Sequence, residues 1–284
     1  MESDLKDRVA VVTGAARGMG RAYVEGFLAR GMKVVATDKS WDGVPEFDKS
    51  QAGNVLTVTM DVTDDAQIDG AYRATLDRFG TVDVLVNNAA MRQRDLFPPT
   101  GRVTTLQTKD SDWQKSFGVN LFGVLKVIRR FILPMIDKRR GSVINAVSSG
   151  ILHHSQGGGY AALRPNSREM PYMSSKAALA TLSFYLADDM LEHNVAVNIV
   201  IPGHTRTTGF DEQNRARLAL GARRGAIPVV PEHIVPIVLF LAGQDASGVT
   251  GRMFDVMKWN AEHGLGGHEA WADKSFSYDA LLTG

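Results

Sequence analysis

The chain has 284 residues, with 32 Lys and Arg against 31 Asp and Glu, and it contains no Cys. This length allows one large domain or two small ones around a substantial core. The formal net charge of +1 gives no electrostatic drive toward nucleic acid or an anionic membrane, so we expect neither as a partner. The absence of Cys excludes disulfides, Cys-ligated zinc and a thiol nucleophile, and we predict no metal site.

The N-terminal residues are charged and lead directly into the apolar segment Val9–Val12, which is not the pattern of a secretory signal. No apolar run approaches the roughly 18 residues that a membrane-spanning helix needs. We therefore expect a cytoplasmic protein.

Short apolar segments alternate with longer helical patterns along most of the chain. In chain order, the predicted elements are strand Val9–Thr13, helix Met19–Arg30, strand Lys33–Asp38, strand Val55–Asp61, helix Ala66–Phe79, strand Val82–Asn87, helix Asp112–Lys138, strand Gly141–Val147, helix Tyr172–His193, strand Val195–Ile201, helix Pro231–Leu241 and strand Arg252–Val256. The strands are rich in Val and Ile and apolar on both faces, as buried parallel strands are. This alternation predicts an α/β fold with a doubly wound parallel sheet.

Three stretches interrupt the alternation. Arg92–Thr108 and His153–Pro171 contain Pro and Gly and are predicted to be loops, and the tail after Val256 has no clear period. Loops of this length in a compact domain are usually functional or mobile. We assign residues 1–257 to one dinucleotide-binding and catalytic domain, and residues 258–284 to a C-terminal extension that packs on this domain or on a neighbouring subunit.

A glycine-rich turn, Thr13-Gly14-Ala15-Ala16-Arg17-Gly18-Met19-Gly20, follows the first strand. Glycines let a backbone turn sharply and approach a pyrophosphate, which is stabilised by the positive end of the following helix. Taken alone, such a glycine cluster is as often only a tight turn as it is a nucleotide-binding turn. Here, however, the next strand ends at Asp38, 18 residues after Gly20, where a carboxylate can accept hydrogen bonds from the adenosine ribose. The predicted dinucleotide contacts are Gly14, Arg17, Gly18, Met19, Gly20 and Asp38.

Asp38 also bears on the choice between NAD and NADP. A carboxylate at this position repels the 2′-phosphate of NADP. Arg17 and Lys39 have the opposite effect, because both can reach a 2′-phosphate; Arg17 equally fits a pyrophosphate contact or a solvated charge. We expect the closer carboxylate to prevail and predict NAD, with NADP as the weaker cofactor.

Tyr172 and Lys176 are four residues apart in a helical segment and share one face. An adjacent ammonium lowers the pKa of a phenol and makes it a usable proton donor or acceptor near neutrality. Ser148 follows the preceding predicted strand, and Asn120 lies in the helix before that strand. Both positions can approach the carboxyl ends of the strands, where ligands bind in a doubly wound sheet.

Taken in order, these motifs resemble the short-chain dehydrogenase/reductase family, over about Asp7 to Val256. Asn120, Ser148, Tyr172 and Lys176 match the catalytic tetrad of the family, whose fold is the Rossmann fold. The resemblance also implies further cofactor contacts: Asp61 and Val62 beside the adenine, Asn88 of Asn87-Asn88-Ala89 at the adenosine side, Tyr172 and Lys176 themselves, and Pro202, Gly203, Thr205 and Thr207 in a segment that covers the nicotinamide carboxamide.

The resemblance implies a role for each member of the tetrad. Tyr172 exchanges a proton with the substrate oxygen, which Ser148 orients, and Lys176 lowers the pKa of the tyrosine and binds the nicotinamide ribose. Asn120 holds a helix irregularity and a water that passes protons toward Lys176. The predicted activity is an NAD-dependent interconversion of a secondary alcohol and a ketone. Two alternatives stay open: an NAD-binding sensor or scaffold without turnover, and an epimerase or dehydratase relative.

The sequence departs from the family between Ser148 and Tyr172, which are 24 residues apart instead of about a dozen. Tyr160 is a competing candidate, but Arg164 stands four residues later and Pro165 interrupts any helix there. His153, His154 and Tyr160 are candidate substrate contacts in this insertion. We expect a moderately large, mostly apolar alcohol that is cyclic, aromatic or terpenoid.

The two longest predicted helices carry apolar residues around more of their circumference than one buried face requires. These residues are Phe117, Leu121, Leu125, Phe131 and Ile132 in the first helix and Leu179, Leu182, Phe184, Leu186 and Leu191 in the second. Members of the family commonly pair these helices with their copies across a twofold axis. We therefore expect a homotetramer, or a homodimer if a second interface is missing.

Overall fold

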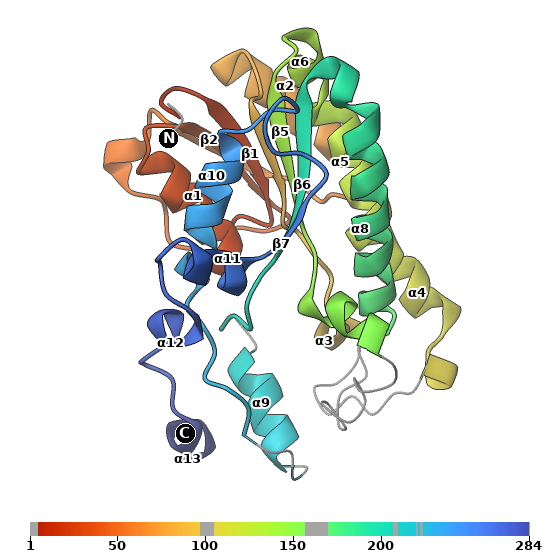
Figure 1. The fold of residues 1–284 in the computed structure, drawn as a ribbon, viewed down its shortest axis with the longest axis vertical. Coiled ribbons are helices and arrows are strands. Elements are labelled where there is room, and N and C mark those ends of the chain that lie inside the picture. The colour runs from red at the N-terminus through yellow and green to blue at the C-terminus, as the bar shows by residue number, and fades with distance from the viewer. Residues whose placement is uncertain are drawn as a thin grey trace.

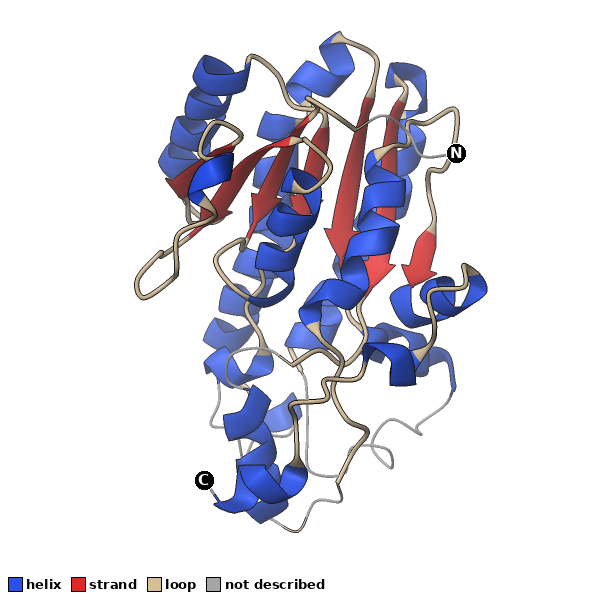
Figure 2. Cartoon of the chain, turned by 90° about the vertical axis from the view of Figure 1, so that its left-hand side faces the viewer, coloured by secondary structure: helices blue, strands red, loops and turns tan. Residues whose placement is uncertain are grey.

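The computed structural model describes residues 5–96, 105–156, 170–206, 210–219, 221 and 224–283; the side chains of residues 93, 94, 153–156 and 283 are not described. Seven parallel strands form one sheet in the order β3-β2-β1-β4-β5-β6-β7, with their carboxyl ends at the same edge (Figure 2). The strands are β1 (Val9–Thr13), β2 (Lys33–Asp38), β3 (Val55–Thr59), β4 (Val84–Asn87), β5 (Gly141–Ala146), β6 (Val195–Ile201) and β7 (Met253–Asp255). The order reverses between β1 and β4, which is where ligands bind in such sheets.

Helices cover both faces of the sheet (Figure 1). One face carries α1 (Gly18–Leu28), α10 (Val235–Ala242) and α11 (Val256–Glu262). The other carries α2 (Asp65–Phe79), α4 (Asp110–Phe117), α5 (Val124–Phe131) and α8 (Tyr172–Asp189). Beyond the carboxyl ends of the strands lie α9 (Phe210–Ala219) and α13 (Tyr278–Thr283). The fold is therefore the doubly wound α/β fold that the sequence predicts.

Shorter helical segments complete the described chain. They are α3 (Gln93–Leu96), α6 (Leu133–Asp137), α12 (His268–Trp271), a π-helical segment (Gly118–Gly123), and 3₁₀ turns at Lys49–Gln51, Thr105–Gln107, Ser149–Gln156, Leu191–His193 and Pro231–Ile234. None of the described helices combines the length and the apolar character that crossing a membrane requires.

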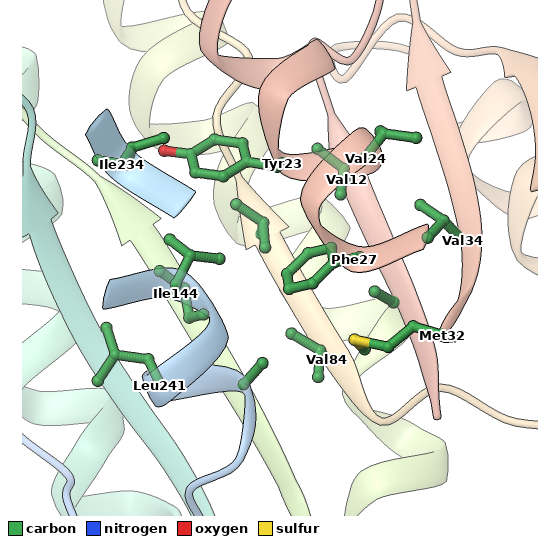
Figure 3. Packing of buried hydrophobic residues seen from close by; sticks show 14 of the residues in the cluster. Val12, Tyr23, Val24, Phe27, Met32, Val34, Val84, Ile144, Ile234 and Leu241 are labelled. Atoms are coloured by element: carbon green, nitrogen blue, oxygen red, sulfur yellow. The ribbon is translucent and has the colours of Figure 1, made fainter. Parts of the chain in front are cut away.

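Two apolar layers hold the helices on the sheet. Under α1 and α10, Tyr23, Phe27, Ile144 and Leu241 are almost completely buried and pack together (Figure 3). A second layer joins the opposite face of the sheet to α2, α5 and α8. All residues of β1, β5 and β6 are buried, which explains why their sequences are mostly apolar on both faces, with buried polar exceptions such as Ser142, Asn145 and Asn198.

The structure differs from the predicted elements in several places. The segment Arg92–Thr108, expected to be a loop, contains α3 and the 3₁₀ turn Thr105–Gln107, and the expected loop His153–Pro171 begins inside the 3₁₀ segment Ser149–Gln156. The expected helix Asp112–Lys138 is interrupted by the π-helical segment at Gly118–Gly123, and a separate turn, α6, begins at Leu133 with Pro134 as its second residue. The polar helix α9 was not predicted, because its sequence has no apolar period. The tail after Val256, where no regular element was expected, forms α11, α12 and α13, and Asp255 caps α11 by accepting the N–H groups of Met257 and Lys258.

Candidate active site

The glycine-rich turn has a shape that only glycine permits. Gly14 and Gly18 have φ angles of +66° and +54°. A Cβ on Gly20 would lie 1.9 Å from the carbonyl oxygen of Gly14, and one on Gly14 would lie 2.8 Å from Cα of Ala89. The turn leads directly into α1, which has no acidic residue in its first turn. These residues fit a dinucleotide, because the backbone can approach a pyrophosphate at the positive end of α1.

Asn88, which follows the neighbouring strand β4, and Thr13, the first residue of the turn, brace the turn by hydrogen bonds. The Asn88 side-chain amide donates to the carbonyl oxygens of Thr13 and Gly14, at 3.1 and 3.0 Å. The Thr13 hydroxyl oxygen accepts the backbone N–H groups of Asn88 and Ala89, at 3.0 and 3.1 Å. Asn88 thus shapes the cofactor turn itself. Thr13 is a bracing residue that the motif contains but that the sequence analysis assigned no role.

Asp38 stands at the end of β2, beside the same turn. Its carboxylate accepts the backbone N–H of Ala16 at 3.0 Å. Arg17 is exposed and donates from its guanidinium to the carbonyl oxygen of Asp42, at 2.7 Å. Lys39 is exposed. The carboxylate is therefore held against the backbone of the turn, and Arg17 contacts the segment after β2.

Asp61 and Val62 follow β3. The Asp61 carboxylate accepts the N–H and the hydroxyl of Thr63, at 2.8 and 2.7 Å. Val62 is buried against the π-helical segment, where a Cβ on Gly123 would lie 2.9 Å from its Cγ2. These residues therefore occupy the same carboxyl edge of the sheet as Gly14 and Asp38.

Asn120 lies within the π-helical segment and is completely buried. Its side-chain oxygen accepts the N–H of Met91 at 2.9 Å, and its nitrogen donates to the carbonyl oxygen of Met91 and to the hydroxyl of Ser175, both at 2.9 Å. The helix irregularity that the family resemblance implies is present at this residue. The side chain ties the segment after β4 to α8.

Lys176 is buried one turn after Tyr172 in α8, and its ammonium donates to the carbonyl oxygen of Ala146 at 2.8 Å. Ala146 ends β5, and Ser148 follows two residues later. Burial, with a smaller effect of the positive charge of Arg92, lowers the pKa of Lys176 to about 7. The structure therefore brings Ser148, Tyr172 and Lys176 to one end of β5 and α8.

Ser175 is a further candidate site residue that was not predicted from the sequence. Its hydroxyl accepts from Asn120 and donates to the carbonyl oxygen of Tyr172 at 2.7 Å, so it connects two members of the predicted tetrad. A Ser before Lys176 is visible in the sequence. Its role depends on the packing of α8 against the π-helical segment, which spacing along the chain does not reveal.

The depressed pKa of Lys176 predicts a pH-dependent stability difference between the protein and its Lys176→Met variant. Between pH 7 and about 10 the unfolded chain binds a proton at Lys176 that the folded chain lacks, so the free energy of unfolding rises with pH. The thioether side chain of the variant cannot titrate. Urea denaturation measures the free energy of unfolding of both proteins. We expect the value for the unmutated protein, relative to that for Lys176→Met, to rise by about 1 kcal/mol per pH unit in this range. A difference independent of pH would contradict the lowered pKa.

The segment after β6 closes the opposite side of the site. The Thr205 hydroxyl donates to the carbonyl oxygen of Gly203 at 2.9 Å and lies 3.6 Å from the sulfur of Met19 in the glycine-rich turn. Pro202, Gly203 and Thr205 are thus placed beside the first helix of the fold. Thr207 and Tyr160 lie outside the described residues, as do the side chains of His153 and His154.

Arg206 continues this segment and was not a predicted site residue. Its guanidinium binds both carboxylate oxygens of Asp211 in α9, at 3.1 and 2.6 Å, and one oxygen of Asp273 in the tail, at 3.1 Å. The guanidinium carbon also lies 5.3 Å from the centre of the Phe276 ring. Arg206 therefore joins the end of β6, α9 and the C-terminal tail beyond the carboxyl ends of the strands.

The sequence model of the short chain dehydrogenase family matches residues 8–218. The chain belongs to this family. Its sequence is 50% identical over 280 residues to the fluoren-9-ol dehydrogenase of Terrabacter sp. (strain DBF63), covering 98% of this chain and 78% of the relative. It is 30% identical over 260 residues to the 3-oxoacyl-(acyl-carrier-protein) reductase of Escherichia coli (strain K12), covering 89% of this chain and 97% of the relative. It is 31% identical over 262 residues to the reductase of that name from Thermotoga maritima, with the same coverages.

The predicted family and reaction class are thereby confirmed. The protein is an oxidoreductase that acts on CH–OH groups, interconverting a secondary alcohol and a ketone with a nicotinamide cofactor. The sensor and epimerase alternatives are not favoured, since a dehydrogenase relative matches nearly the whole chain.

Proposed function

We propose that this protein is an NAD-dependent dehydrogenase of polycyclic aromatic secondary alcohols, with fluoren-9-ol as its type substrate. The observation that carries the proposal is the 50% identity, over 98% of the chain, to a fluoren-9-ol dehydrogenase. The substrate agrees with the large, mostly apolar alcohol expected from the sequence. The reaction converts the alcohol and NAD⁺ into the ketone, NADH and a proton.

The nicotinamide cofactor, when bound, supplies the hydride acceptor or donor. The residues of the chain orient the substrate and transfer the proton of its hydroxyl group. Tyr172 takes the proton of the substrate hydroxyl in oxidation and returns it in reduction, and Ser148 hydrogen-bonds and orients the same oxygen. Lys176, whose side-chain nitrogen donates to the carbonyl oxygen of Ala146, contacts the ribose and, in its protonated form, stabilises the deprotonated phenol. Asn120 keeps the π-helical segment against α8 and holds the water that passes protons toward Lys176.

NAD is the proposed cofactor because of the charge at the end of β2. The Asp38 carboxylate is fixed by the N–H of Ala16, so it cannot swing away from a 2′-phosphate without losing this hydrogen bond. One N–H group of the exposed Arg17 guanidinium donates to the carbonyl oxygen of Asp42, which directs this side chain toward the segment after β2. The remaining proposed contacts are Gly14, Gly18, Met19, Gly20, Asp61, Val62, Asn88, Tyr172, Lys176, Pro202, Gly203, Thr205 and Thr207.

Initial rates with a small panel of substrates test the proposed substrate class. We expect kcat/KM for fluoren-9-ol with NAD to exceed that for propan-2-ol by about 10²-fold or more, because the burial of each added aromatic ring contributes to binding. The competing activity is reduction of a 3-oxoacyl thioester, which the names of the 30% identical relatives suggest. A higher kcat/KM for the thioester than for fluoren-9-ol would refute the proposal.

We propose that residues 1–257 form the dinucleotide-binding and catalytic domain and that residues 258–284 complete its substrate side. Several contacts support packing of this extension on its own subunit. Val229 pairs with Ala272 in an isolated bridge, Arg206 binds Asp273, and Arg215 of α9 donates to the carbonyl oxygen of Leu281 at 3.1 Å. Phe276 packs against Phe210 of α9 in the same layer.

We also propose a homotetramer, built on a dimer that pairs α5 and α8 with their copies. Phe131, Ile132 and Leu179 are buried in the chain's own core, so they do not support this interface. Exposed apolar side chains in α8 and in the segments next to α5 and α8 support it: Phe184 and Tyr185 in α8, Phe122 in the π-helical segment before α5, and Leu191 in the turn after α8. Of these, Tyr185 is 71% exposed. Their exposure is the argument for a second copy as the occupant of this surface.

Light scattering on the purified protein tests this assembly. We expect a tetramer, and we expect Tyr185→Glu to shift it toward smaller species by placing a charge in an apolar interface. Ala52→Glu, which adds the same charge at an exposed position after the Lys49–Gln51 turn, should leave the assembly unchanged. A fully active monomer at micromolar concentration would contradict the proposal. A dimer would contradict only the second interface, which the tetramer requires.

A further inference from the structure

His233 is completely buried in the 3₁₀ turn that precedes α10, and both of its ring nitrogens have partners. Nδ1 lies 2.8 Å from the carbonyl oxygen of Val230, and Nε2 accepts the backbone N–H of Gly203 at 3.0 Å. A carbonyl oxygen can only accept a hydrogen bond, so the ring proton is on Nδ1 and Nε2 is the acceptor. The ring thus joins the turn before α10 to the end of β6.

The helix α11 contacts both His233 and Gly203 and stabilises this arrangement. Asn260, also completely buried, donates from its side-chain amide to the carbonyl oxygen of His233 at 2.7 Å. Met257, one turn earlier in α11, packs on Gly203, where a Cβ would lie 3.0 Å from the Met257 sulfur. His233 and Gly203 are therefore fixed relative to each other by three segments that are far apart in the sequence.

The neutral state of the ring matches this geometry. Burial lowers the pKa of His233 to about 4, so the imidazole is uncharged near neutrality. A proton on Nε2 would place two N–H donors against each other at Gly203. The side chain is therefore a fixed hydrogen-bond acceptor at the carboxyl end of β6.

We infer that His233 is a positioning residue for the dinucleotide, which acts by fixing Gly203 and, through it, the segment Pro202–Thr205. The inference rests on the proposed function, which places this segment beside the nicotinamide. The Thr205 hydroxyl donates to the Gly203 carbonyl and lies beside Met19 of the glycine-rich turn, so Gly203 sets the separation of the two sides of the cofactor site.

Loss of the acceptor at His233 weakens cofactor binding rather than the chemical step. Without the hydrogen bond from Gly203 to His233, the segment Pro202–Thr205 must become ordered when the dinucleotide binds. The entropy lost in this ordering reduces the affinity for the dinucleotide. Ser148 follows β5, and Tyr172 and Lys176 lie in α8; His233 contacts neither element through any described hydrogen bond. The expected signature is a higher KM for NAD with kcat nearly unchanged.

Two amide variants that differ by one methylene group test this inference. The Gln side chain of His233→Gln is long enough to offer its oxygen to the N–H of Gly203, whereas the Asn side chain of His233→Asn is not. We expect His233→Asn to raise the Kd for NADH and the KM for NAD by about 10-fold, as for one lost buried hydrogen bond, and His233→Gln to stay within about 3-fold of the unmutated protein. In both variants, kcat at saturating NAD and KM for fluoren-9-ol should stay within about 3-fold. His193→Asn, in the turn before β6, is the matched control.

The results separate this inference from the proposed function. If the unmutated protein bound no dinucleotide, the proposed function would fail; if it bound NAD and His233→Asn bound NAD equally well, only the inference would fail. A joint loss of kcat and of both KM values would show a general structural role and also overturn it. If His233→Asn does not fold, Asn260→Leu takes its place, because it removes the donor to the His233 carbonyl. An unchanged KM for NAD in that variant overturns the inference too.

Discussion

Replacing Tyr172 with Phe should lower turnover by about 10²–10⁴-fold, the usual range for a lost general acid or base. The change removes one oxygen atom and keeps the ring, so α8 and the Ser175 hydrogen bond to the Tyr172 carbonyl should persist. Cofactor affinity should stay within about 3-fold, since Lys176 and the glycine-rich turn are untouched. Steady-state rates with fluoren-9-ol and fluorescence titration with NADH measure the two quantities.

Two further variants make this result specific. Tyr72→Phe removes a phenol oxygen from α2, far along the chain from the tetrad, and should leave turnover near that of the unmutated protein. Tyr160→Phe tests the rival tyrosine of the insertion. Near-normal turnover in Tyr172→Phe together with a large loss in Tyr160→Phe would overturn the assignment of the acid–base group.

Removing the Asp38 carboxylate should shift cofactor preference from NAD toward NADP by about 10²-fold in the ratio of the two kcat/KM values. The carboxylate is held at the edge of the cofactor turn by Ala16, and it repels a 2′-phosphate there. Asp38→Ser removes the charge and keeps a small polar group. In that variant Arg17 and Lys39 are no longer opposed and attract the phosphate.

Asp42→Ser is the control, because it removes an acidic side chain four residues after Asp38. Arg17 donates to the backbone carbonyl of Asp42 and not to its carboxylate, so this contact should persist. Asp42→Ser should leave the preference for NAD in place. A preference for NADP in the unmutated protein would show that Arg17 and Lys39 outweigh Asp38. A ratio that Asp38→Ser does not alter would show that the carboxylate takes no part in the selection.

The sheet was predictable because its strands are short, apolar on both faces and separated by clear helical patterns. The register of β1 against β2 and β4 then brings Gly14, Asp38 and Asn88 to one edge, as the order of motifs indicated. The π-helical segment at Asn120 was implied by the family resemblance, and no local period marks it. The polar α9 and the short helices of the tail are stabilised by tertiary contacts such as those of Arg206, so periodicity along the chain could not reveal them.

The candidate site also contains residues that the sequence predicts and residues that only the structure reveals. Tyr172, Lys176 and the glycine-rich turn follow from spacing within one or two elements. Ser175 and His233 do not, because each acts through a partner more than 25 residues away, Asn120 in one case and Gly203 in the other. A buried hydroxyl or imidazole gains its role from what the fold places opposite to it, and this is visible only in three dimensions.

The transfer of label from fluoren-9-ol deuterated at C9 tests the central claim most directly. Deuterium should be found at C4 of the nicotinamide in the NADH formed, with one fluoren-9-one per NADH and a slower rate than with the unlabelled alcohol. Ketone formation without deuterium in the cofactor, or binding of NAD and alcohol without any NADH, would contradict the account.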